Sequence, residues 1–192
     1  MSARSTVLLG ACGHGIGPGD VELSMDDLRV VARFAAGSAG EVLQLFEADR
    51  PGDPRPRVAV DAARSFAVGA DRTTLQRVAA VDAHRAAKDA VAEAAKHAAH
   101  AAGDAAAAAY LHPLARASQV GHILRATAHA ARAAELAAGG APAVGDRCVE
   151  RAGRRATPGL VDVLRRYPAA PTGKNRVAQL MTALDLSLRA GP

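Results

Sequence analysis

Hydrophobic residues recur at helical spacing over several long stretches of the chain, and turn-forming residues separate these stretches. Apolar residues three, four and seven positions apart share one face of a helix. In the first stretch, Ser24 and Asp27 have the spacing of a capping box, and Pro51 and Gly52 form a turn at its far end. The pattern predicts a helix over residues 24–47, with one face formed by Leu28, Val31, Phe34, Ala35, Val42, Leu43 and Phe46.

The same reasoning predicts helices along the rest of the chain. The third is the longest, and it is expected to run without interruption through residues 88–96 until Gly103 bends or breaks it. No segment has the pattern of a parallel strand. The fold class is therefore predicted to be all-α, a single-domain helical bundle or array of about seven helices over residues 23–192. Beyond the first helix, the expected ranges are 55–68, 72–100, 104–110 and 113–138. Two or three shorter helices are expected to follow, at about 144–152, 158–167 and 175–189.

Residues 1–22 contain five glycines and predict a flexible tail. A phosphate-binding glycine loop would need a βαβ unit around it, and none is indicated. The sequence before Cys12 resembles a lipoprotein cleavage site, but its apolar run, Val7 to Leu9, is too short for a signal peptide. Cys12 and Cys148 are far apart, so we expect free thiols in a reducing compartment. These observations predict a cytoplasmic protein without a membrane span.

Composition explains how such helices could pack and adds a question about charge. Hydrophobic residues make up 49% of the chain and aromatic residues only 3%, and many of the former are alanine, the strongest helix former. Alanine buries little surface, so the core requires close contacts between helices.

The net charge is +5, with a basic excess concentrated in residues 141–192. That segment has only one aromatic residue, Tyr167, which disfavours nucleic-acid binding.

Seven histidines are the most distinctive chemical groups in the sequence. His97 and His100 are three residues apart on one predicted helix. His122 and His129 share a face of another helix with Arg125 and Arg132, and these arginines would repel a divalent cation. Neither an HExxH motif nor a Glu-x-x-His motif occurs. We therefore predict no metal ligand and no cofactor.

Nucleophilic catalysis has no clear support either. No serine occupies a G-x-S-x-G turn, and Cys148 has no histidine beside it in the sequence. A small buried side chain is the simpler interpretation of Cys148. Whether the protein is an enzyme is left open, with a non-catalytic role favoured.

Several short motifs resemble a family of bacterial helical proteins. They include Asp53-x-Arg55-Pro56-Arg57, Tyr110-Leu111-His112-Pro113 and Arg165-Arg166-Tyr167-Pro168. With the matching order of motifs between them, they resemble the helical immunity-protein family of polymorphic toxin systems over about residues 24–189. The resemblance implies a small all-helical protein that binds and neutralises a cognate protein toxin.

The predicted toxin-binding surface follows the shared helical face and consists of His112, Gln119, His122, Arg125 and His129. One alternative is a small-molecule-binding or metal-dependent helical-bundle protein that uses His97, His100 or His122. Another is a nucleic-acid-associated protein that uses the basic groups of residues 147–166. The identity of the toxin and the oligomeric state are left open.

Overall fold

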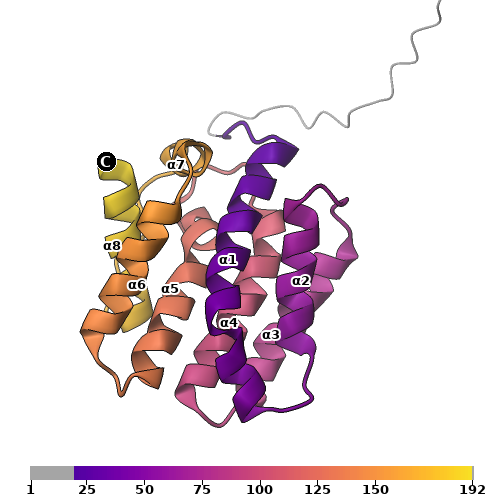
Figure 1. The fold of residues 1–192 in the computed structure, drawn as a ribbon. Coiled ribbons are helices and arrows are strands. Elements are labelled where there is room, and N and C mark those ends of the chain that lie inside the picture. Colours follow the sequence, from indigo (N-terminus) through magenta and orange to yellow (C-terminus); the bar gives the residue numbers. More distant parts are fainter. Residues whose placement is uncertain (1–19, 192) are drawn as a thin grey trace, which may run out of the picture.

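The computed structural model describes residues 20–191, and this part of the chain is built from helices (Figure 1). The predicted all-α fold class is confirmed, with eight α-helices in the described residues where about seven were expected. Most of the predicted tail, and Cys12 within it, lies outside the described residues. The elements are α1 (Met25–Asp49), α2 (Arg55–Ala67), α3 (Thr74–Asp89), α4 (Glu93–Ala107), two short 3-10 helices (Ala108–Tyr110 and Ala117–Gln119), α5 (Val120–Ala137), α6 (Pro142–Arg155), α7 (Pro158–Arg165) and α8 (Arg176–Ala190).

Helix α1 begins where the sequence predicted, because both halves of the capping box form. The Asp27 amide donates to the Ser24 hydroxyl at 3.1 Å, and the Ser24 amide donates to the Asp27 carboxylate at 2.8 Å. These bonds satisfy two of the backbone groups that a helix start leaves without partners. Residues of the predicted apolar face, such as Val31 and Phe46, are fully buried.

Helix α4 is the centre of the fold. It contacts α1, α2, α3 and α5, and Figure 1 shows it behind α1, between α3 and α5. A helix packed on several sides needs small side chains if its neighbours are to approach closely. Alanine meets this need, and the residues buried along α4 are Ala95, Ala98, Ala99, Ala101, Ala102, Gly103, Asp104, Ala105 and Ala106.

The predicted long helix over residues 72–100 is wrong, because the chain turns between α3 and α4. Ala90 has extended backbone angles, φ −68° and ψ 144°. The carboxylate of Asp49, at the end of α1, accepts hydrogen bonds from the amides of Val91 (2.9 Å) and Ala92 (3.0 Å). A distant side chain thus takes the role of a helix cap at a place where alanine alone would continue the helix. Gly103 does not break α4 but lies inside it.

Helix α5 begins later than the expected residue 113. The carbonyl of Pro113 accepts from the Val21 amide at 2.9 Å, and that of His112 accepts from the Tyr167 hydroxyl at 2.8 Å. Tertiary contacts therefore use backbone groups that a helix starting at Pro113 would need. The chain passes through the second 3-10 helix before α5 starts at Val120.

Helices α5, α6 and α8 contact one another on the far side of α1 from α2 and α3 (Figure 1). This arrangement brings the first turns of α8 to the face of α5 that also borders α4. None of the described helices combines the length and the apolar character that a membrane crossing requires.

Candidate functional site

Four histidines from three helices form a continuous row of imidazole rings. We call His84 on α3, His97 and His100 on α4, and His129 on α5 the histidine row. The ring centroids of His84 and His100 are 5.3 Å apart, those of His100 and His129 5.1 Å, and those of His129 and His97 5.0 Å. The Nδ1 atoms of His84 and His100 are 3.1 Å apart, and those of His97 and His129 are 2.8 Å apart. Each pair can form a hydrogen bond when one ring donates and the other accepts.

Burial keeps the histidine row neutral. Removal from water lowers the pKa of all four imidazoles, and their neighbours in the row contribute to the effect for His97, His100 and His129. The effect is largest for His129, whose pKa falls to about 2. The rings therefore act at neutral pH as uncharged hydrogen-bond donors and acceptors.

A buried ion pair adjoins the row. Asp104, on α4, is only 2% exposed, and its Oδ1 accepts from Nε of Arg125 at 2.9 Å. Its Oδ2 makes no hydrogen bond with the described protein atoms. The Nε2 atoms of His84 and His129 lie 3.7 and 3.8 Å from this carboxylate, which is too far for a good hydrogen bond. The carboxylate thus depends on Arg125 for charge compensation.

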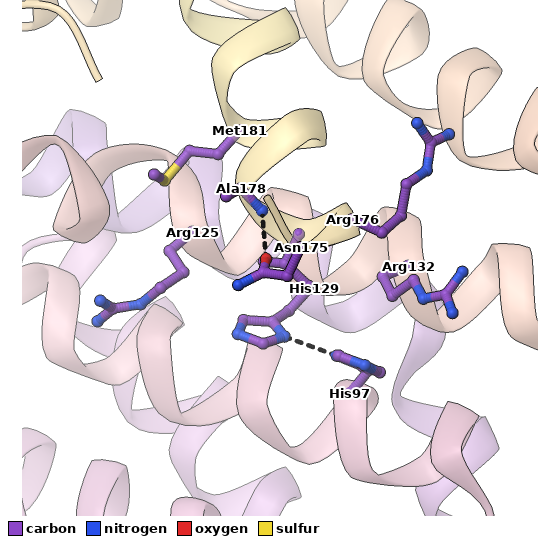
Figure 2. Close-up of a pocket in the computed structure, with 9 residues that line it drawn as sticks. His97, Arg125, His129, Arg132, Asn175, Arg176, Ala178 and Met181 are labelled. Atoms are coloured by element: carbon purple, nitrogen blue, oxygen red, sulfur yellow. Dashed lines mark hydrogen bonds between the residues drawn. The ribbon is translucent and has the colours of Figure 1, made fainter. Parts of the chain in front are cut away.

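A pocket of about 490 Å³ opens where α4 and α5 meet the start of α8. Figure 2 shows His97 and His129 together in it, with Arg125 on one side and Arg132 on the other. Asn175 caps α8, and its Oδ1 accepts from the Ala178 amide at 2.8 Å. The lining residues are His97, Arg125, His129, Arg132, Asn175, Arg176, Val177, Ala178 and Met181.

The structure brings part of the predicted binding set together and separates the rest. Arg125 and His129 both line the pocket. His112, Gln119 and His122 do not line it, but they are linked to each other near the start of α5. The Gln119 side chain accepts from the His112 amide at 3.1 Å, and the rings of His112 and His122 meet edge to face at 6.4 Å. The role of the five residues as a toxin-binding surface stays a prediction.

Sequence reasoning missed several residues of this site. His84 is 13 residues before His97, with a turn between them, so no helical spacing relates the two. Arg176 and Met181 come from α8, and no local pattern links that helix to α5. Arg132 was identifiable from its position on the α5 face, and Asp104 from its spacing of four residues after His100.

Neither a metal site nor the basic segment of residues 147–166 gains support from the described residues. Within residues 20–191, no three His, Cys, Asp or Glu side chains are placed so that they could hold one metal ion. Three of the six arginines in residues 147–166 are paired with carboxylates. Arg151 bonds to Glu41 at 2.8 Å and Arg155 bonds to the same carboxylate, while Arg166 bonds to Asp27 at 2.9 Å. Such pairing weakens the case for a phosphate-binding surface.

The fold and the pocket define a class of all-α protein with a surface site built from neutral histidines and ion-paired arginines. A family model described as "Imm-5 like putative immunity protein" matches residues 22–156 of the chain. The match covers more than half of the sequence, and the chain belongs to this family. The matched region includes the histidine row, Arg125 and Arg132. The residues at the start of α8 that line the pocket lie after the matched region. No curated protein and no solved structure matches the chain.

Proposed function

We propose that this protein binds the toxin of a polymorphic toxin system and neutralises it by covering the surface that the toxin needs for its activity. Membership of the immunity-protein family over residues 22–156 is the observation that carries this proposal. A cytoplasmic location is part of the same proposal.

The proposed contact surface begins at His112 and Gln119, before α5, and continues along α5 through His122 to Arg125 and His129 at the pocket. It combines exposed polar groups with a partly enclosed centre, as protein interfaces commonly do. Arginine is also enriched among the residues that dominate binding energy at such interfaces.

Affinity capture of the tagged protein from its own host, followed by mass spectrometry, tests the proposal. We expect a stoichiometric protein partner that is toxic when it is expressed alone and harmless when it is expressed with this protein. Recovery of the protein without a partner, from cells that make the candidate toxin, would contradict the proposal.

Variants of the α5 surface test its location. Alanine at His122 and His129 together is expected to weaken partner binding at least about tenfold, because contacts at the centre of an interface are lost. Glu150→Ala on α6 is the control, since Glu150 is exposed and lines a different pocket, together with Arg154 and Arg165. Binding is measured by calorimetry on folded variants. Unchanged affinity in the double variant would place the interface elsewhere.

The volume of the pocket favours a second candidate function, the binding of a small molecule. Its apolar lining from Val177, Ala178 and Met181 suits an organic ligand with a polar end. Native mass spectrometry and elemental analysis of the purified protein separate the candidates. A small molecule retained in stoichiometric amount would favour this second function over toxin binding, whereas a metal alone would not support it.

A further inference from the structure

The chemical character of the pocket points to the group that it accepts. Three of its nine lining residues are arginines, one is asparagine, and none carries a carboxylate. The Asn175 oxygen is used by the helix cap, so its amide NH₂ is left as a donor. A cationic ligand would meet three guanidinium groups, whereas an anionic ligand would meet donors on several sides.

We propose that the pocket between α5 and α8 receives an acidic side chain from a loop of the partner protein. This inference rests on the proposed function, which it extends by naming the chemistry of the partner. Guanidinium groups bind carboxylates through directed, charge-assisted hydrogen bonds. The pocket is larger than one carboxylate, and Val177 and Met181 give apolar contact to the methylene groups and to the flanking residues of the loop.

Buried carboxylates hold the pocket's arginines in place before any ligand arrives. Glu135 is 1% exposed and bonds to both Arg132 and Arg176, the latter at 2.9 Å. Asp104 holds Arg125 in the same way. Neither carboxylate lines the pocket, so they orient the guanidinium groups from behind. Groups that are already ordered lose less entropy on binding, which favours affinity.

Arg132 is the arginine with the most donor capacity left for a ligand. It bonds to Glu135 through Nη1, which leaves Nε and Nη2 unused by this carboxylate. Arg176, in contrast, also bonds to Asp146 at 2.7 Å and to the Pro142 carbonyl at 3.0 Å. Replacing Arg132 still leaves Glu135 paired with Arg176, so the fold should tolerate the change.

The first experiment uses a defined probe and does not require the toxin. The full-length, isotope-labelled protein is titrated with the peptide acetyl-Ala-Glu-Glu-Ala-amide, and NMR follows the ring signals of His97 and His129. We expect saturable shifts that acetyl-Ala-Gln-Gln-Ala-amide does not produce. Arg132→Gln should weaken peptide binding about tenfold, because charge-assisted hydrogen bonds are lost. Arg132→Lys should retain part of the affinity.

Arg154→Gln is the matched control, because it removes one positive charge from α6 outside the pocket. This variant should bind the glutamate peptide like the wild type. Thermal melts establish that each variant is folded. Shifts that are absent at millimolar peptide, or equal in Arg132→Gln and Arg154→Gln, would overturn the inference.

The captured partner then gives a second, independent measurement. Weaker binding of the partner to Arg132→Gln than to Arg154→Gln supports the inference, and equal binding overturns it while the proposed function stands. Peptide binding at the pocket without any captured partner would support the pocket as a carboxylate-binding site and would contradict the proposed function.

Discussion

At the scale of single residues, the site depends on a few charges whose environments differ greatly. The side chain of Asp104 is 2% exposed, whereas that of its partner Arg125 is 43% exposed. Water can therefore solvate the guanidinium if the pair is broken, but it cannot reach the carboxylate in the same way. The ion pair is thus energetically asymmetric, and its two halves should respond differently to mutation.

This asymmetry predicts the order of two substitutions. Arg125→Ala leaves a buried carboxylate without compensation and should lower the free energy of unfolding by about 3 kcal/mol. Asp104→Ala leaves an arginine that turns into solvent and should cost about 1–2 kcal/mol. Urea denaturation followed by circular dichroism measures both. An equal loss, or a larger loss for Asp104→Ala, would show that the buried carboxylate is not the vulnerable partner.

At the scale of secondary-structure elements, the spacing between α3 and α4 positions the histidine row. A Cβ atom on Gly103 would lie 2.8 Å from two ring atoms of His84 and 3.0 Å from the carbonyl oxygen of Ala80. The absence of a side chain therefore allows His84 to lie against α4, within reach of His100. A glycine that looked like a helix breaker in the sequence is a point of close contact between two helices.

Two glycine substitutions within helices should therefore have opposite effects. Gly103→Ala should destabilise the protein by about 1–3 kcal/mol, because α3 or His84 must move. Gly37→Ala, in α1, should be neutral or stabilise by up to about 1 kcal/mol. A Cβ there would lie 3.6 Å from the nearest atom, on the Arg155 side chain, and alanine is the better helix former. Chemical denaturation of both variants tests the contrast, and a neutral Gly103→Ala would refute the close contact.

At the scale of the whole molecule, the histidines link the stability of the fold to pH. Burial is the main cause that lowers the pKa of five histidines in the folded chain, namely His84, His97, His100, His122 and His129. In the unfolded chain, a histidine has a pKa near 6.5. As pH falls through this value, the unfolded chain binds protons that the folded chain does not, and folding becomes less favourable.

We therefore expect the unfolding free energy to be highest above pH 6.5 and to decrease as pH falls toward 5. His129 alone should contribute a loss of about 1.4 kcal/mol at one pH unit below its unfolded pKa. Thermal melts between pH 8 and pH 5 measure the effect. His129→Gln should flatten the profile, because the imidazole with the largest pKa difference between the folded and unfolded chain is then absent. A wild-type stability that is independent of pH in this range would contradict the expectation.

Local sequence signals determined most of the helices of this protein. Capping boxes, prolines and apolar periodicity act over a few residues, so the start of α1 and most of the other helices could be predicted from them. The α5 face with His122, Arg125 and His129 was also visible, because positions on a single helix are related by its period alone.

Only the tertiary structure decided where the long alanine-rich stretch is interrupted and what the α5 face meets. The break before α4 depends on Asp49, more than 40 residues away, because its carboxylate caps the amides of Val91 and Ala92. The pocket likewise requires His97 and Arg176 from two other helices. Helical periodicity specifies which side chains share a face, but the packing of helices against one another specifies which faces meet.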